Sequence, residues 1–189
     1  DNKTICIGIS ERTPLESIVK IVPLCYNEGF EKIIAVDLPK KRALMHLDTI
    51  FTRISENEVL VFPPILESKF KKHLNNVYIF KNKNIRPTLV KNDLISILNK
   101  DSVHIKYIKC GSDSKIMQER EQWTDGANAF ALSPGKIIGY DCNPCTLKEL
   151  EENGYKVITS ANYISNYKIF NSSNKKLVIT IKISNFNSL

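Results

Sequence analysis

The stretch Ala43-Leu44-Met45-His46-Leu47-Asp48-Thr49-Ile50-Phe51-Thr52 decides how the rest of the chain is interpreted. From His46 onward, polar and apolar side chains alternate, and in an extended strand the side chains at positions i and i+2 point to the same face. The alternation therefore predicts a strand over residues 44–54, with His46 and Asp48 side by side on one face. An imidazole beside a carboxylate in an otherwise apolar run indicates a face that lines a polar cavity.

The chemistry of this pair suits proton transfer near neutral pH. Histidine is the side chain whose ordinary pKa lies closest to that range, and a carboxylate beside it could stabilise the imidazolium or bind a cationic substrate. The alternative is a structural histidine next to a surface aspartate, because His-x-Asp pairs are frequent in strands. The pair by itself leaves both interpretations open.

Patterns on either side predict alternating strands and helices. Thr13-Pro14-Leu15-Glu16 predicts a capping box with Pro14 in the first helical position, and the helix should turn Ile18, Val22 and Leu24 inward and end before Gly29. Further helices are expected over 92–99 and 146–152. Strands are expected over 4–10, 31–36, 59–62, 77–80, 103–109, 129–132, 136–140, 156–159 and 177–181.

The order strand, strand, helix, strand recurs about every 50 residues, which is the spacing of a repeated supersecondary unit. Such a repeat fits an arrangement of similar units around a central site. The pattern alone predicts an α/β protein with mixed sheets.

Composition narrows the class of protein. The chain has 189 residues, of which 42% are hydrophobic, and this is sufficient for a sizeable core. No apolar run approaches the roughly 20 residues of a membrane span, and the first residues lack the layout of a signal peptide. The net charge of +7 comes from scattered lysines without an aromatic platform, so a solvated surface is favoured over a nucleic-acid interface.

Five cysteines are too few and too irregularly spaced for a disulfide framework, which favours reduced thiols in a cytoplasmic protein. Cys142-Asn143-Pro144-Cys145 is a C-x-x-C motif without a second such motif or a nearby histidine. A turn that contains two cysteines is the favoured interpretation, and metal or redox use is the alternative. We expect no cofactor and no metal.

Four blocks in this order and spacing resemble the C-terminal half of arginine deiminases: Ile9–Thr13, Pro39–Thr49, Arg120–Asn128 and Pro134–Asp141. The resemblance runs from about Ile5 to Thr159. It implies a pentein-type fold, a five-bladed α/β-propeller built of ββαβ modules in the guanidine-modifying superfamily. We therefore expect residues 1–189 to be a single incomplete propeller domain of roughly three modules, 1–55, 56–110 and 111–189.

The resemblance implies a hydrolase that converts L-arginine to L-citrulline and ammonia through a covalent cysteine intermediate. Guanidinium is planar, cationic and a poor electrophile, so carboxylates must hold its N–H groups and fix its carbon against the thiolate. His46 would be the general acid and base, and Asp48 would bind guanidinium N–H groups. Arg12 and Asn128 match positions that hold the substrate α-carboxylate.

Each of these residues also has a structural interpretation. Arg12 precedes a helix and could pair with Glu11 or Glu16, and Asn128 could be only a turn residue after Asp125 and Gly126. Arg120 and Glu121 are expected to form a buried or half-buried ion pair without a catalytic role.

The family mechanism also needs a second aspartate and a glutamate from a segment upstream, and a nucleophilic cysteine from a segment downstream. None of the five cysteines stands at the matching place, so we expect this polypeptide to be inactive alone. The alternative is a truncated pseudoenzyme that keeps arginine binding or an interaction role. Exposed sheet edges would favour companion segments or a homo-oligomer, while no nucleic-acid or membrane partner is expected.

Overall fold

The computed structural model describes residues 3–66, 76–91, 94–99 and 104–182. The chain forms two compact units, each made of two segments. Unit 1 comprises residues 1–47 and 64–105, and unit 2 comprises residues 48–63 and 106–189. The α/β class expected from the sequence is confirmed, because strands and helices occur together in both units. Within the described residues, no helix has the length and apolar composition that crossing a membrane requires.

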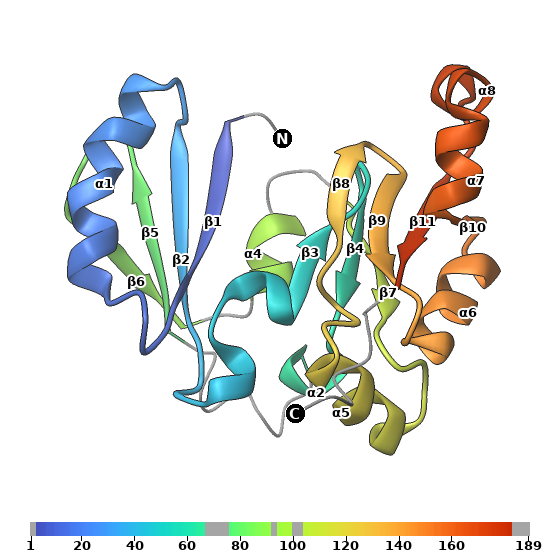
Figure 1. Ribbon diagram of the computed structural model, residues 1–189. Helices are drawn as coiled ribbons and strands as arrows, with labels where there is room; N and C mark the ends of the chain where they lie inside the picture. The colour runs from blue at the N-terminus through green and yellow to red at the C-terminus, as the bar shows by residue number, and fades with distance from the viewer. Residues whose placement is uncertain (1–2, 67–75, 92–93, 100–103, 183–189) are drawn as a thin grey trace. The chain divides into compact units, whose positions relative to one another are not determined.

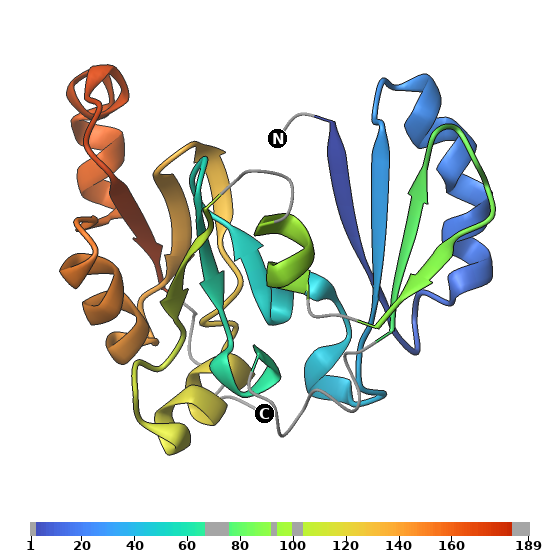
Figure 2. The ribbon, with the colours of Figure 1, turned by 180° about the vertical axis from the view of Figure 1, so that it is seen from behind.

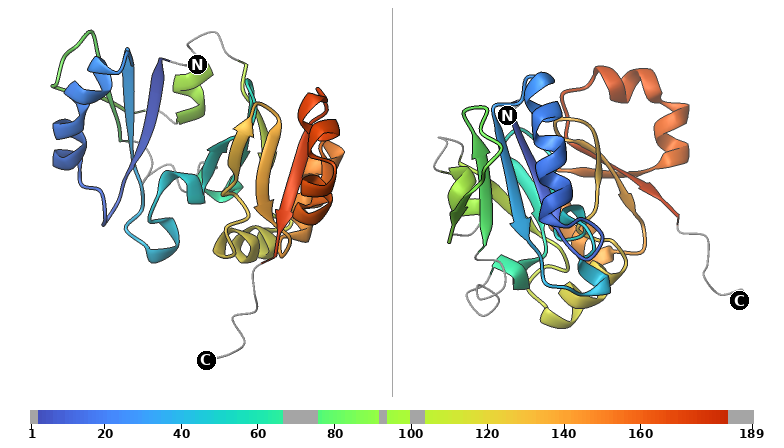
Figure 3. Two further views of the ribbon diagram at one scale, coloured as in Figure 1. Left: turned by 45° about the horizontal axis from the view of Figure 1, so that its top comes forward. Right: turned by 90° about the vertical axis from the view of Figure 1, so that its left-hand side faces the viewer.

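Unit 1 is built around one mixed sheet of order β1-β2-β5-β6 (Figure 1). β1 and β2 are parallel, and β2, β5 and β6 are antiparallel neighbours. α1 (Leu15–Asn27) connects β1 to β2, as a parallel crossover requires, and lies over one face of the sheet (Figure 3). The strands are β1 (Thr4–Ile9), β2 (Lys32–Asp37), β5 (Val77–Lys81) and β6 (Thr88–Val90).

The core of unit 1 lies between α1 and this sheet. Ile18 and Val22 of α1 are fully buried against Ile33 and Ala35 of β2 and against Phe80 of β5. The spacing of four residues between Ile18 and Val22 places them on one helix face, while residues two apart in β2 share one face of the sheet. Two further helices, α2 (Pro63–Leu66) and α4 (Leu94–Asn99), are short.

Two details of α1 differ from the sequence-based expectation. The helix begins at Leu15, with Pro14 in the cap position and no side-chain cap hydrogen bond, so the predicted capping box is wrong. Proline fits there because its extended backbone, with ψ of 157°, leads directly into the first turn. Leu24 is 62% exposed rather than inward, because it lies on the face opposite the sheet. For the helix predicted over 92–99, the expected capping residue Asn92 lies outside the described residues.

The strand predicted over residues 44–54 is wrong for most of its length. Two 3-10 helices, η1 (Arg42–Leu44) and η2 (Leu47–Thr49), occupy its first half, and only β3 (Phe51–Arg53) is extended. A polar–apolar alternation over five residues is also compatible with tight turns, which bury Leu44 and leave His46 exposed. The shared strand face of His46 and Asp48 therefore does not exist.

Unit 2 contains two sheets, whose strands are labelled in Figure 1 and seen from behind in Figure 2. The smaller sheet has the order β3-β4-β7, with β3 and β4 antiparallel and β4 and β7 parallel. The larger sheet has the order β10-β11-β9-β8, in which β10, β11 and β9 are parallel and β8 is antiparallel at the edge. The remaining strands are β4 (Glu58–Val61), β7 (Lys106–Lys109), β8 (Phe130–Ser133), β9 (Lys136–Tyr140), β10 (Lys156–Thr159) and β11 (Leu177–Ile181).

The main core of unit 2 joins both sheets. Leu60 and Ile108 of the smaller sheet pack with Ile137 and Val178 of the larger sheet and with Leu150 of α6. On the other face of the larger sheet, a smaller cluster forms beneath the last two helices. The helices of unit 2 are α5 (Lys115–Trp123), α6 (Pro144–Glu152), α7 (Ser160–Ser165) and α8 (Tyr167–Ser172).

A buried carboxylate ties three strands of unit 2 together. Glu58 of β4 is 3% exposed, and it accepts hydrogen bonds from the hydroxyl of Tyr155 at 3.0 Å and from Lys176 Nζ at 2.6 Å. Burial, together with the negative charge of Glu58, raises the pKa of Tyr155 above its ordinary value. Because Tyr155 precedes β10 and Lys176 precedes β11, Glu58 fixes where both strands begin.

Candidate functional site

Arg12 lies in the loop that follows β1 in unit 1. The backbone N–H of Arg12 donates to Ser10 Oγ at 3.2 Å, and Ser10 N–H donates to the carbonyl of Thr13 at 3.1 Å. Ser10 is buried, while the side chain of Arg12 is exposed. The loop thus holds the backbone in a tight turn and leaves the guanidinium of Arg12 available to a ligand.

His46 lies in the bend between η1 and η2 and is exposed. The segment that carries it passes close to β1 because residue 8 is glycine: a Cβ there would lie 2.7 Å from Leu38 Cδ1 and 3.0 Å from Leu47 N. The Leu38 N–H also donates to the Ile9 carbonyl at 2.9 Å. Unit 1 therefore brings the Arg12 loop and the His46 segment to the same end of the sheet, namely the C-terminal ends of the parallel strands β1 and β2.

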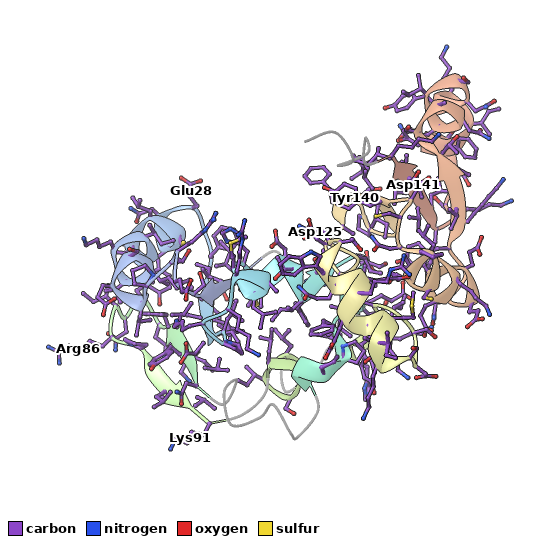
Figure 4. The ribbon with its side chains drawn as sticks, turned by 60° about the horizontal axis from the view of Figure 1, so that its bottom comes forward. Glu28, Arg86, Lys91, Asp125, Tyr140 and Asp141 are labelled. Atoms are coloured by element: carbon purple, nitrogen blue, oxygen red, sulfur yellow. The ribbon has the colours of Figure 1, made fainter. Side chains whose placement is uncertain are left out.

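Asp48 lies in η2, belongs to unit 2 and is exposed. Its negative charge acts on a second carboxyl group, Asp125, in the turn after α5 (Figure 4). Partial burial, and next the charge of Asp48, raises the pKa of Asp125 above its ordinary value. Two like charges that influence each other in this way create a negative potential, which favours a cationic ligand.

Asn128 follows Asp125 in the same turn and is half-buried. Its N–H donates to the Asp125 carbonyl at 3.0 Å, and the Gly126 N–H donates to the Glu121 carbonyl at 2.6 Å. A side chain at residue 126 would not fit, because a Cβ would lie 2.7 Å from the Glu121 carbonyl oxygen and 2.9 Å from Cys110 Sγ. The turn that carries Asp125 and Asn128 is therefore packed tightly against α5.

Glu121, which precedes this turn in the chain, connects it to the first turn of α6. It is 1% exposed, and its carboxylate accepts hydrogen bonds from the Cys145 N–H at 2.8 Å, from the Thr146 N–H at 2.8 Å and from Thr146 Oγ1 at 2.6 Å. Two of these donors are otherwise unpaired N–H groups in the first turn of α6. The ion pair predicted between Arg120 and Glu121 is wrong, because Arg120 is exposed and Glu121 caps a helix instead.

A second connection joins the start of α6 to the turn. Thr124 Oγ1 donates to Asn143 Oδ1 at 2.5 Å, and Asn143 Nδ2 donates to the Thr124 carbonyl at 3.0 Å. Asn143 is the cap residue of α6 and is 2% exposed. In addition, Gln122 Nε2 of α5 donates to the Thr49 carbonyl at 3.4 Å, and this hydrogen bond links α5 to the segment that carries Asp48. Hydrogen bonds from α5 thus connect the segment of Asp48, the Asp125–Asn128 turn and the start of α6.

None of the three cysteines of unit 2 has the lowered pKa of a nucleophilic thiol. Burial raises the pKa of Cys110 to about 12, and burial also raises the pKa of Cys142 and Cys145. A thiol reacts as its thiolate, so these groups are mostly unreactive at neutral pH. In the described part of the chain, no three His, Cys, Asp or Glu side chains gather in a way that could hold a metal ion.

The four predicted site residues are divided between the two units. Arg12 and His46 lie in unit 1, and Asp48 and Asn128 lie in unit 2. Sequence reasoning missed Asp125 as a neighbour of Asp48 and missed the role of Glu121. The signal for the turn was present in Asp125-Gly126, since this pair favours a turn with a left-handed first residue. Asp125 indeed has φ of 58°.

Comparison with known proteins gives one consistent result. The family model for arginine deiminase matches residues 1–165 of the chain. The arginine deiminase of Mycoplasma capricolum subsp. capricolum is 37% identical over 164 residues, which cover 85% of this chain and 40% of that protein. The corresponding protein of Lactococcus lactis subsp. lactis is 34% identical over 168 residues, covering 82% and 38%. The chain spans about two fifths of the length of these relatives.

Proposed function

Because this chain belongs to the arginine deiminase family, we propose that it contributes to the hydrolysis of L-arginine to L-citrulline and ammonia. The observation that carries the proposal is the family match over residues 1–165, which contains Arg12, His46, Asp48 and Asn128. The chain's own chemistry supports it, since a cationic substrate suits the negative potential around Asp48 and Asp125.

In the proposed reaction, a cysteine thiolate attacks the guanidinium carbon, and His46 donates a proton to the nitrogen that leaves as ammonia. The neutral imidazole then takes a proton from water, and the resulting hydroxide attacks the same carbon. The C–S bond then breaks while the hydroxyl group of the tetrahedral intermediate loses its proton to solvent, which releases citrulline and restores the thiolate. Asp48 holds guanidinium N–H groups through charge-assisted hydrogen bonds, so that the carbon faces the sulfur.

Arg12 and Asn128 are proposed to hold the α-carboxylate of the substrate. Arginine offers a planar pair of donors that matches a carboxylate, and the asparagine amide adds a further donor. The exposed guanidinium of Arg12 and the fixed, half-buried position of Asn128 are compatible with these roles.

We further propose that this polypeptide alone does not turn over arginine and that the nucleophilic cysteine comes from a companion segment. The raised pKa of Cys110, Cys142 and Cys145 supports this, because a reactive nucleophile requires a thiolate. The same observation favours a second candidate, a pseudoenzyme that binds arginine without converting it. A pentein-type propeller of three modules and a cytoplasmic location stay predictions.

The substrate roles can be tested in a chimera, in which residues 1–165 replace the aligned segment of the Mycoplasma capricolum protein. We expect Arg12→Ala to raise the KM of the chimera for L-arginine about 10- to 100-fold with a smaller change in kcat, because a charge-assisted hydrogen bond contributes about 1.5–3 kcal/mol. Steady-state citrulline assays measure both constants.

Arg86→Ala is the matched control, because Arg86 is an exposed arginine of unit 1 in the loop before β6 (Figure 4). Its replacement should leave KM unchanged. An unchanged KM in the Arg12→Ala chimera would remove Arg12 from the proposed site.

A further inference from the structure

A polar cleft of about 370 Å³ opens in unit 2, at the end where the strands β4, β9 and β11 begin. Three segments line it: residues 55–56 between β3 and β4, residues 133–136 at the turn between β8 and β9, and residues 173–176 between α8 and β11 (Figure 1). Small-molecule sites in proteins have volumes in this range. The cleft is therefore large enough for a small ligand.

Backbone hydrogen bonds hold the three segments together. The Gly135 N–H donates to the Ile54 carbonyl at 2.9 Å, and the Leu177 N–H donates to the Gly135 carbonyl at 2.8 Å. Gly135 has φ of 77°, a conformation that glycine adopts without strain, and a Cβ at this residue would lie 3.3 Å from Lys176 Cγ. The walls of the cleft are thus fixed relative to one another.

Two lysines of the cleft keep donors that a ligand can use. Lys136 Nζ donates to the Asn171 carbonyl at 2.7 Å, which fixes the ammonium group and leaves two of its three N–H donors. Lys175 is exposed, and its backbone N–H donates to Ser173 Oγ at 3.1 Å. Because Ser173 Oγ accepts this hydrogen bond, its own hydrogen can be donated to a ligand.

The charge of the cleft is positive after its carboxylates are included. Lys176 pairs with the buried carboxylate of Glu58 at 2.6 Å and so adds little net charge. Glu56 is exposed and adds one negative charge, while the guanidinium of Arg53 donates to its backbone carbonyl and places a positive charge beside it. The cationic side chains in and beside the cleft therefore outnumber the carboxylates, which favours an anionic ligand.

From this arrangement we propose that the cleft binds a phosphate group, either as free phosphate or as part of a small non-aromatic ester. Phosphate carries about −1.5 to −2 charges near neutral pH and has several acceptor oxygens, which suit lysine ammonium groups and a serine hydroxyl. None of the described lining residues is aromatic, so the cleft has no ring on which a nucleobase could stack. The proposal is independent of the function proposed above.

Titration of the unmodified chain, followed by its amide NMR signals, tests this site. The probes are inorganic phosphate and glycerol phosphate, added at constant ionic strength, with sodium chloride as the reference. We expect saturable shifts that centre on residues 133–136 and 173–176 with both probes and not with chloride. Tighter binding of glycerol phosphate would support an ester as the ligand, and equal affinities would support free phosphate. Shifts that do not saturate, or that spread over the lysines of both units, would overturn the proposal.

Variants make the test specific. Lys136→Gln/Lys175→Gln should raise the Kd for phosphate at least about 10-fold, because charge-assisted hydrogen bonds are stronger than neutral ones. Glu56→Gln should lower the Kd, since it removes a negative charge from the cleft, and this result does not depend on the lysine variant. Lys20→Gln/Lys91→Gln is the matched control, because it removes the same charge from two exposed lysines of unit 1 (Figure 4). Equal Kd values in the two double variants would contradict the proposal.

Discussion

Replacing His46 by alanine in the chimera is expected to lower kcat for citrulline formation by about 10²- to 10⁴-fold, which is the usual contribution of a general acid or base. The proposed roles explain the size of the effect, because His46 would act twice, as the acid for the departing ammonia and as the base for the attacking water. KM should change less, since in the proposed role the imidazole would contact the reacting atoms rather than the distant end of the substrate.

The matched control for this variant is His104→Ala, because His104 is an exposed histidine that precedes β7 and has no proposed role. Asp48→Asn should also lower kcat/KM strongly, since the amide lacks the negative charge with which Asp48 is proposed to hold guanidinium. Asp113→Asn, which changes an exposed carboxylate paired with Lys109, should leave kcat/KM unchanged. Full activity of His46→Ala would contradict the assignment of His46.

The second large effect concerns stability and needs no assumption about function. Glu121→Ala should lower the free energy of unfolding of the chain by about 3–5 kcal/mol, because it leaves the N–H groups of Cys145 and Thr146 and the Thr146 hydroxyl without their buried acceptor. Denaturant unfolding followed by circular dichroism measures the change.

Two further variants make this test specific. Glu119→Ala, in the same helix but exposed, should stay within about 0.5 kcal/mol of the unmodified chain. Glu121→Gln keeps one acceptor oxygen and should lose less stability than alanine, which also provides a readout if the alanine variant does not fold. Equal stabilities of Glu119→Ala and Glu121→Ala would show that Glu121 does not hold the start of α6.

Most strands could be predicted from the sequence, because their apolar side chains alternate or run continuously. The bounds predicted for β9 and β11, residues 136–140 and 177–181, agree with the structure. These strands lie in the interior of the larger sheet, where β11 is buried at four consecutive residues, Leu177–Thr180, and β9 buries Ile137.

α5 could not be predicted by the same reasoning. Its inward face carries Gln118, Glu121 and Gln122, all buried, so the helix has no apolar stripe that would reveal its period. These polar groups are satisfied by partners distant in sequence, such as Thr146 and Thr49. The carboxylate that positions the turn was for this reason mistaken for half of an ion pair.

The geometry predicted for the candidate site is wrong, because two 3-10 helices replace the strand on which His46 and Asp48 were expected to share a face. The roles of the two residues stay predictions. The neighbour that the structure adds in unit 2, Asp125, is 77 residues from Asp48 in sequence, by the difference of their numbers. An electrostatic interaction across that separation depends on packing, and no local sequence pattern indicates it.

Citrulline formation from L-arginine, measured with the purified chain and with the chimera under the same reducing conditions, tests the proposed function most directly. We expect no citrulline from the chain alone and steady formation by the chimera, because residues 1–165 would supply Arg12, His46, Asp48 and Asn128 to a complete enzyme. Citrulline from the chain alone would mean that one of its own cysteines is the nucleophile. A folded chimera without activity would contradict the proposed function and leave the pseudoenzyme as the better description.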